Sequence, residues 1–144
     1  MRSRRIKPVA THADQVQEQA VQVYVAAQQL VVDAQLQLKQ LIEYRTEYSS
    51  NRGSNDTNAT QLRDYQLFLQ KINRSIEQSK TNIEHQKQLC EQQKLNWLKT
   101  RSRSKALEAV IKKYQLSEAK IEARIEQKEQ DEHASRMSRH VNKN

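Results

Sequence analysis

Turn-forming residues are gathered at one place in this 144-residue chain. The chain has a single glycine and a single proline, whereas turns depend on Gly, Pro, Asn and Asp for their unusual backbone dihedrals. Only the segment Ser49–Asn58 combines glycine with several Ser, Asn and Asp residues. One break in so long a chain leaves room for few, long elements, and it excludes a compact domain with many turns.

The composition predicts that these elements are helices. Only 35% of the residues are apolar and 29% are charged, which by itself would also fit a disordered chain. The apolar residues, however, recur at a fixed spacing, and the abundant Gln, Glu, Lys, Arg, Ala and Leu favour helix intrinsically. We therefore predict an all-α fold in which two long helices form an antiparallel coiled-coil hairpin.

The single turn cluster sets the predicted boundaries. Gly53 suits the left-handed position that follows a helix, and Asn58 can cap the next helix with Gln61 as its capping partner. The first helix is predicted at about residues 10–51, a loop at about 52–57 and the second helix at about 58–136, with residues 137–144 as a frayed tail.

Both helices carry the apolar spacing of a coiled-coil seam. The second helix has an uninterrupted seven-residue repeat that starts at Leu62, with a second row three residues later and polar layers in its middle at Ser79, Gln86, Gln93, Thr100 and Ser104. In the first helix the steps alternate between four and three residues with a slip after Ala34, and small residues at alternate layers allow close approach. The predicted seam there is Val16, Ala20, Val23, Ala27, Leu30, Ala34, Leu38, Leu41, Tyr44 and Tyr48.

The second helix is predicted to be nearly twice as long as the first, about 115 Å against about 60 Å. Folded back from the loop, the first helix would finish its pairing near residue 100. The second helix then forms an overhang whose apolar stripe needs another partner. Self-association and docking into a different protein are both open. The stripe consists of Leu107, Ile111, Tyr114, Ile121 and Ile125.

The net charge of +8 is placed at the two ends of the chain. Residues 11–100 are neutral, whereas residues 1–10 and 101–144 each contribute +4, and in a hairpin these ends meet at one pole. Acidic and basic residues alternate near the C-terminus, which is typical of a solvated helix face and disfavours a polyanionic partner. We expect no nucleic acid among the partners, with a basic nucleic-acid-binding coiled coil and a self-associating structural coiled coil kept as alternatives.

The residue pattern argues against an enzyme and against a bound cofactor or metal. The four histidines lack ligand-like spacing, one glycine cannot build a phosphate-binding loop, and Cys90 lies at a seam position as a small core residue. A two-helix seam is also too narrow for a substrate pocket. The chain has no apolar run long enough for a membrane span and no secretory signal, which fits a cytoplasmic protein.

Four aromatic residues lie close to the turn. Tyr44 and Tyr48 end the first helix, and Tyr65 and Phe68 begin the second. Tyr65 can cap the seam, but the others cannot all fit in it. An exposed aromatic cluster has the composition of a binding hot spot.

The sequence resembles the FliJ family of the bacterial flagellar type III export apparatus. The resemblance rests on a Tyr-Arg-x-Glu-Tyr element and a Glu-Gln-Lys-x-x-Asp-Glu-x-Ala-x-Arg ending, neither of which a heptad repeat dictates. The segments that carry it are Leu41–Tyr48, Leu62–Leu69, Ala106–Glu108 and Arg124–Arg136.

This resemblance implies a coiled-coil stalk similar to that of the ATP synthase gamma subunit. It implies a terminal end that inserts into the hexameric ring of the flagellar export ATPase, here carried by Arg4, Arg5, Leu107, Ile111, Tyr114, Ile121, Arg124, Ile125, Gln127, Asp131 and Arg136. It further implies a patch for the export-gate membrane protein at Gln37, Leu41, Tyr44, Tyr48, Phe68 and Ile72, with Ser75 and Ser79 less securely placed.

Other expectations follow from the same resemblance. FliJ-like proteins bind export chaperones, and they associate peripherally with the inner membrane at the flagellar base. We expect this chain to be a monomer when free and to hold no cofactor.

Overall fold

The computed structural model describes residues 1–52 and 58–142, and two helices account for nearly all of them. Helix α1 spans Arg2–Arg52 and helix α2 spans Ala59–Asn142. No strand occurs within these described ranges. The predicted all-α hairpin is therefore confirmed, while the predicted left-handed Gly53 lies outside the described residues.

The start of α2 has the predicted N-cap. The backbone N–H of Gln61 donates to Asn58 Oδ1 at 2.8 Å, and the N–H of Leu62 donates to the carbonyl oxygen of Asn58 at 3.1 Å. A helix start leaves four N–H groups without intrahelical acceptors, and the Asn58 side chain satisfies one of them.

Both helices extend further than predicted at the terminal ends. Helix α1 begins at Arg2 and contains Pro8, whereas the sequence suggested a start near residue 10. Its first turn is held by contacts to α2 that are described below. Helix α2 continues through Asn142 rather than ending at about 136, and Arg139 in its last turn complements the negative end of the helix dipole.

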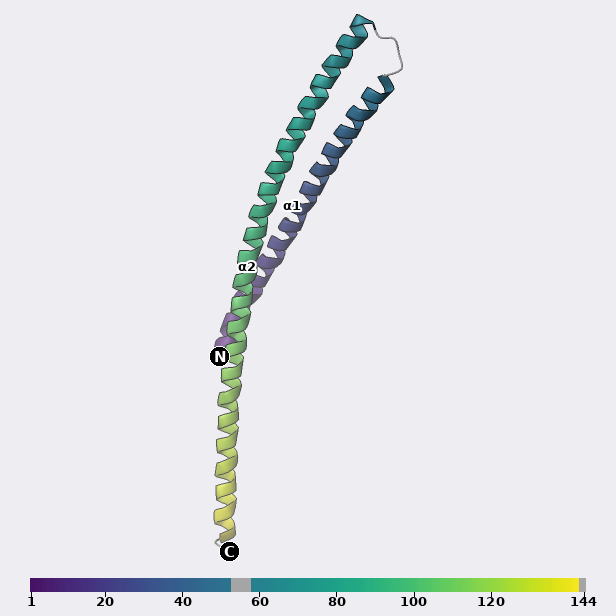
Figure 1. Cartoon of the computed structure of the whole chain (residues 1–144). Helices are drawn as coiled ribbons and strands as arrows, with labels where there is room; N and C mark the ends of the chain where they lie inside the picture. Colours follow the sequence, from purple (N-terminus) through teal and green to yellow (C-terminus); the bar gives the residue numbers. More distant parts are fainter. Residues whose placement is uncertain (53–57, 143–144) are drawn as a thin grey trace. The chain divides into compact units, whose positions relative to one another are not determined.

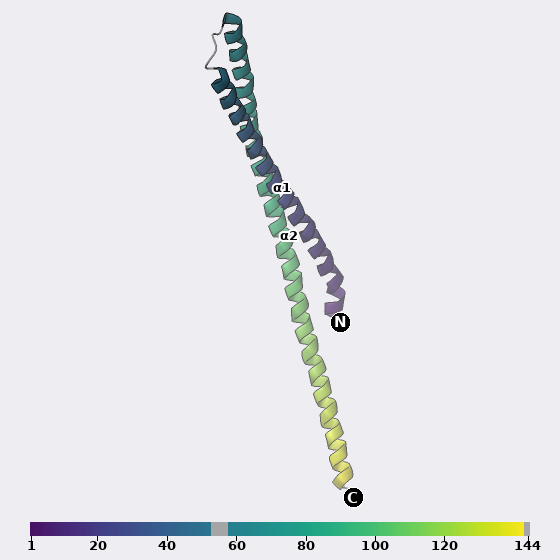
Figure 2. The same ribbon diagram turned by 90° about the vertical axis from the view of Figure 1, so that its right-hand side faces the viewer.

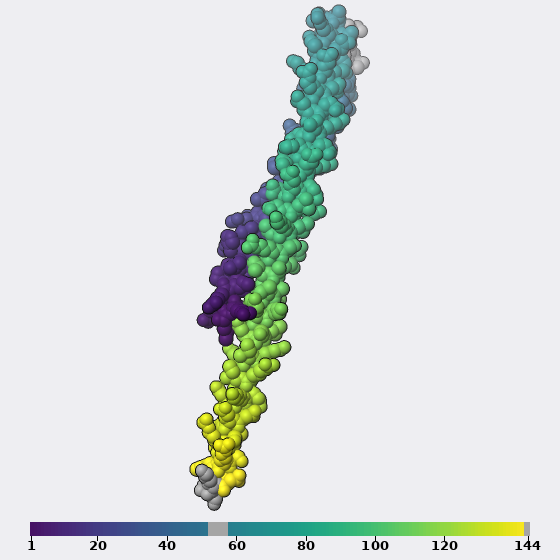
Figure 3. Space-filling view, turned by 90° about the vertical axis from the view of Figure 1, so that its left-hand side faces the viewer, coloured from purple at the N-terminus to yellow at the C-terminus, as the bar shows by residue number. Residues whose placement is uncertain are grey.

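The chain divides into two units, and in each of them a segment of α1 lies antiparallel to a segment of α2. One unit joins Met1–Gln17 with Lys99–Asn144, and the other comprises Glu18–Leu98. Within the second unit, α1 and α2 lie side by side in both ribbon views (Figures 1 and 2), and Tyr24 contacts Trp97 with ring centroids 5.7 Å apart. Within the first unit, the N-terminal segment lies against α2 (purple on green in Figure 3).

The predicted seam of α2 is confirmed from Tyr65 to Glu118. Its buried or half-buried residues follow the seven-residue repeat without interruption, including the half-buried Cys90. Ile72, Ile76 and Ile83 are its buried apolar residues, and each such side chain contributes about 1.5–3 kcal/mol on burial.

The prediction of the α1 seam is correct for every second layer and wrong for the layers between them. The alanine layers are correct, since Ala20, Ala27 and Ala34 are buried, but Val16, Val23 and Leu30 are exposed. The alternate layers are formed by the next residue along, namely Gln17, Tyr24 and Val31. With this register the three–four alternation continues through Leu38, Leu41, Arg45 and Tyr48, and the predicted slip after Ala34 disappears.

The pairing of the helices also extends further than predicted. Half-buried residues of α2 continue through Leu107, Ile111, Tyr114 and Glu118, whereas every described residue from Ile121 onward is exposed. The expectation that pairing ends near residue 100 was wrong because α1 begins eight residues earlier than predicted. The overhang is therefore the part of α2 from Ile121 to Asn142.

The corrected register predicts effects of very different size for two adjacent valines. Val31→Asp places a carboxylate in the seam and is expected to lower the free energy of unfolding by about 1–3 kcal/mol. Val32→Asp changes an exposed side chain and is expected to shift it by less than about 0.5 kcal/mol. Urea unfolding followed by circular dichroism measures both, and equal losses in the two variants would contradict the register.

Candidate binding surfaces

The four aromatic residues near the turn form one connected cluster in the Glu18–Leu98 unit. The ring centroids of Tyr48 and Phe68 are 3.9 Å apart, Tyr44 and Phe68 meet edge-on at 5.6 Å, and Tyr48 and Tyr65 stack at 5.6 Å with an interplanar angle of 10°. Aromatic pairs in such geometries contribute about 0.5–1.5 kcal/mol beyond burial. The aromatic cluster is therefore a packed unit as well as a surface.

The members of the aromatic cluster differ in exposure. Tyr48 and Tyr65 occupy seam positions and are half-buried, and Tyr65 Oη donates a hydrogen bond to Ser49 Oγ at 3.1 Å. Phe68 is half-buried beside the seam, and Tyr44 is 53% exposed. The prediction that these aromatics cannot all enter the seam is correct, because Tyr44 is exposed; its place in the predicted seam of α1 is therefore wrong, and Arg45 takes that position.

The other residues of the proposed gate patch surround the aromatic cluster at different depths. Ile72 is buried and Leu41 half-buried, so both lie in the seam, while Gln37 is exposed. The structure brings Gln37 and Leu41 together with Ser75 and Ser79. These four line a groove of 360 Å³ with Gln78 and Asn82.

The first turn of α1 is fastened to α2 in the unit that holds both termini. Glu118 accepts two hydrogen bonds from Ser3, one from the backbone N–H at 3.2 Å and one from Oγ at 2.6 Å. The guanidinium of Arg2 lies over the ring of Tyr114, 5.9 Å from its centroid. The heptad repeat placed Glu118 at a seam position of α2, but the sequence did not predict its contact with Ser3.

The Ser3–Glu118 contact brings a carboxylate to the start of α1, which has none of its own. The first turn contains no acidic residue, although a helix N-terminus has unpaired N–H groups and favours negative charge. The hydroxyl of Ser3 holds the pKa of the Glu118 carboxyl below its ordinary value, helped by the Ser3 N–H and the N-terminal ammonium and opposed by desolvation. In the sequence, two features alone pointed to this contact. One is an acidic residue at a seam position of α2, and the other is the lack of an acidic residue in the first turn of α1.

A larger groove lies beside this contact. It has a volume of 680 Å³, and the residues that line it include Met1, Arg2, Tyr114, Ile121 and Ile125. Ile121 and Ile125 are both about half exposed. The groove therefore combines apolar side chains with the basic Arg2 at the point where α2 loses its neighbour.

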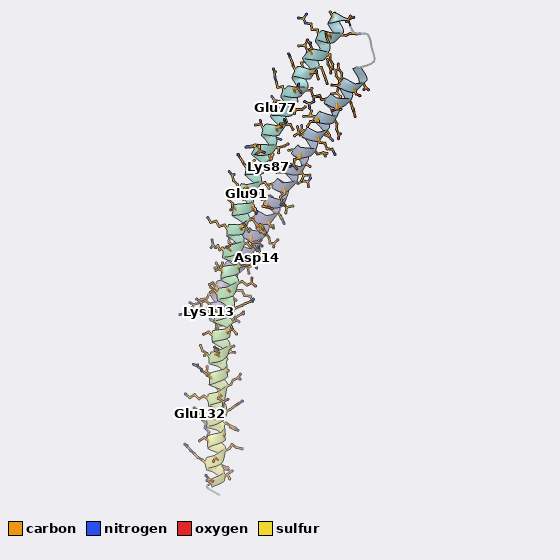
Figure 4. All side chains as sticks on the ribbon, in the orientation of Figure 1. Asp14, Glu77, Lys87, Glu91, Lys113 and Glu132 are labelled. Atoms are coloured by element: carbon orange, nitrogen blue, oxygen red, sulfur yellow. The ribbon has the colours of Figure 1, made fainter. Side chains whose placement is uncertain are left out.

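The residues predicted for the ATPase-binding end fall into two classes. Leu107, Ile111 and Tyr114 are half-buried in the seam rather than part of a free stripe. The exposed class has two members at the start of α1, and its other members extend along the overhang, which in Figure 4 continues past Glu132 without α1 beside it. It consists of Arg4, Arg5, Ile121, Arg124, Ile125, Gln127, Asp131 and Arg136, with Gln127 Nε2 donating to Asp131 Oδ1 at 3.3 Å.

The charge of the chain follows the division into units. Residues 1–17 and 99–144 hold sixteen Lys and Arg against eight Asp and Glu, whereas residues 18–98 hold nine of each. The whole net charge of +8 therefore belongs to the unit that contains both termini. Both basic ends of the chain therefore lie in the same unit.

Two features are absent from the described residues. No group of three His, Cys, Asp or Glu side chains in residues 1–52 and 58–142 could hold a metal ion. Neither helix, over its described length, has a stretch apolar and long enough to cross a membrane.

Comparisons with known proteins identify the relatives of the chain. A family model described as "Flagellar FliJ protein" matches residues 1–143. The chain is similar to the Flagellar FliJ protein of Salmonella typhi, with 29% identity over 108 residues that cover 73% of this chain and 74% of the relative.

The Ser3–Glu118 contact predicts how pH affects the start of α1. Because the pKa of Glu118 is lowered in the folded state, the contact contributes at and above the ordinary glutamate pKa of 4.5 and is lost as the pH falls below it. NMR order parameters of the Ser3 and Arg4 amides should therefore drop in acid. Glu118→Gln should lower these order parameters already at pH 7. The control is Glu122→Gln, one turn further along α2, which should leave the pH dependence of the order parameters as it is in the wild type. A profile unchanged by Glu118→Gln would contradict the assignment.

Proposed function

Because the chain belongs to the FliJ family of flagellar export proteins, we propose that it acts as a stalk that binds two different partners. The observation that carries this proposal is the segregation of charge and aromatic residues. One unit holds the net charge of +8 and the exposed overhang, and the neutral unit holds the aromatic cluster. A structural coiled coil needs neither feature, whereas a protein with two partners needs two chemically distinct surfaces.

The basic unit is proposed to bind the ring of the flagellar export ATPase. Its overhang is a single helix with a solvated, charged surface and two exposed isoleucines, Ile121 and Ile125. Such a helix can enter a ring, because no second helix widens it there. The groove beside Arg2 and Tyr114 can receive an apolar side chain from the ring.

The aromatic cluster is proposed to bind the cytoplasmic domain of the export-gate membrane protein. Tyr44 presents an exposed ring that packs edge-on against Phe68, and Phe68 in turn packs on Tyr48. A rigid aromatic anchor loses little conformational freedom on binding, which is why tyrosine is common in interface hot spots.

The remaining parts of the proposal concern partners and location. We expect the chain to bind export chaperones, to be a monomer when free, and to act in the cytoplasm at the inner-membrane face of the flagellar base. Contact with the gate protein through the aromatic cluster would account for a peripheral membrane association.

The overhang can be tested with the purified export ATPase. Replacing Ile121 and Ile125 with Asp is expected to weaken ATPase binding at least about tenfold, because two apolar anchors become charged. Surface plasmon resonance with the full-length chain measures this. The control is Leu116→Asp, since Leu116 is an even more exposed apolar residue of α2 that does not line the groove. Undiminished binding of the Ile121/Ile125 variant would remove the overhang from the interface.

The aromatic cluster can be tested with the purified cytoplasmic domain of the export gate. Tyr44→Ala combined with Phe68→Ala is expected to weaken binding at least about tenfold while the helicity by circular dichroism stays unchanged. The control replaces two other exposed side chains, Leu36 and Leu67, with Ala. Equal affinity of both double variants would return the aromatic cluster to a structural role.

A further inference from the structure

The net charge of the unit that holds both termini is confined to one part of it. Residues 1–17 and 99–117 contain ten Lys and Arg against two Asp and Glu, whereas residues 118–144 contain six of each. The overhang that is proposed to enter the ATPase ring therefore lies in a neutral segment. The whole net charge of +8 belongs to the paired segments of α1 and α2 next to it.

One side of these paired segments carries no acidic residue. Arg2 of α1 and Lys113 and Ser117 of α2 line the same groove, which places them on one side of the seam. Residues seven or fourteen positions from them lie on that same side of a coiled coil, and Arg5 is one turn from Arg2. We call this side the acid-free face. Its basic residues are Arg2, Arg5, Lys99, Arg103 and Lys113.

The acidic residues of the paired segments lie elsewhere. Asp14 is five residues from Val9, and Glu108 is five residues from Arg103, so each is about 140° around its helix from the acid-free face. Glu108 is already paired with Lys112 at 3.8 Å. Within residues 1–52 and 58–142, the basic side chains of the acid-free face form no ion pair of their own.

Exposed valines lie among these charges. Val9 is 45% exposed and Val16 is 36% exposed, and Val110 is half-buried across the seam. A phosphate backbone is bound through its charge, and helices that lie on a membrane surface insert Trp, Phe or Leu. Basic residues interleaved with valine therefore favour a protein surface that is acidic and partly apolar.

Charge and position together select the occupant of the acid-free face. A second copy of the chain would place one basic face against another, because a two-fold contact uses the same patch on both copies, and like charges facing each other disfavour association. The acid-free face is also continuous with the groove, with which it shares Arg2 and Lys113. A ring that encloses the overhang therefore meets this face at its opening.

We propose that the acid-free face binds an acidic surface at the opening of the export ATPase ring while the overhang lies inside the ring. This inference rests on the proposed ring binding and adds the chemistry of the partner surface. The charges act during approach, since opposite charges raise association rate constants by about 10–1,000-fold. The apolar residues of the neutral overhang act afterwards, by slowing dissociation.

Three charge-removing substitutions in the full chain test the proposal. Arg5→Gln, Lys99→Gln and Arg103→Gln together remove three charges from the acid-free face and leave the groove and the overhang unchanged. Surface plasmon resonance with the purified export ATPase, at an ionic strength of about 0.15 M, measures the association rate constant. It is expected to fall at least about fivefold, and its dependence on salt should become less steep.

The matched control removes three charges from the opposite side. Lys7, Lys105 and Lys112 each lie two residues from a member of the acid-free face, which places them about 160° around the helix from it. Lys7→Gln with Lys105→Gln and Lys112→Gln changes the net charge equally. It should lower the association rate constant by less than about twofold, because charges more than about 8 Å apart are screened at this ionic strength.

The outcomes separate this inference from the proposed function. If the wild-type chain does not bind the ATPase, both are overturned. If Ile121→Asp/Ile125→Asp weakens binding but the two glutamine variants slow association equally, or neither does, only the acid-free face is overturned. It is also overturned if the Arg5/Lys99/Arg103 variant binds the ATPase like the wild type but loses binding to phosphatidylglycerol vesicles or to duplex DNA. Circular dichroism checks that both variants keep the wild-type helicity.

Discussion

The alanines that recur every seven residues in α1 decide how closely the two helices approach. Ala20, Ala27 and Ala34 are all buried, and a layer built on alanine leaves no room for a second large side chain from the same helix. The residues that alternate with them, Tyr24 and Val31, fill the seam from α1. Large neighbours such as Val23 and Leu30 are therefore held outside, so the narrow seam itself creates the exposed apolar row beside it.

The seam changes in character toward the ends of α1. Past Leu41 its positions are taken by Arg45 and Tyr48. Arg45 Nη1 donates to Asn73 Oδ1 at 2.8 Å, and Tyr48 packs on Phe68. At the opposite end of α1, the seam position of Ser3 is paired with Glu118. Directional contacts replace apolar burial where the pairing ends, because side chains there reach water and burial alone stabilises them weakly.

The seam of α2 could be predicted because its repeat is dominated by large apolar residues at fixed spacing, as at Ile72, Ile76 and Ile83. The seam of α1 could not, because two rows pass through the same alanines. Val16 and Val23 lie on one row, and Gln17 and Tyr24 lie on the other. Hydrophobicity favours the valines, and only packing against α2, such as Tyr24 on Trp97, selects the second row. The sequence of one helix does not contain that information.

The candidate surfaces also differ in whether the sequence could predict them. The aromatic cluster was predictable because one turn brings residues 44–48 back to residues 65–68. The start of α1 was not, since Ser3 and Glu118 are 115 residues apart and neither is unusual by itself. The groove at Ser79 was also hidden, because a serine in a heptad does not show whether its hydroxyl finds a partner.

A two-helix protein has no enclosed interior, so wherever its helices pair, a binding surface must be made from the flanks of the seam. Chemistry can then differ only between the two sides of the seam or along its length. This chain shows both differences. Glu–Lys pairs line α2 on one side of the seam in the Glu18–Leu98 unit, whereas the groove at Gln37 and Asn82 is lined by uncharged residues, and the net charge is confined to the unit with the termini. Small seam residues make this possible, because they leave the flanking positions free of any packing role and therefore free to specify partners.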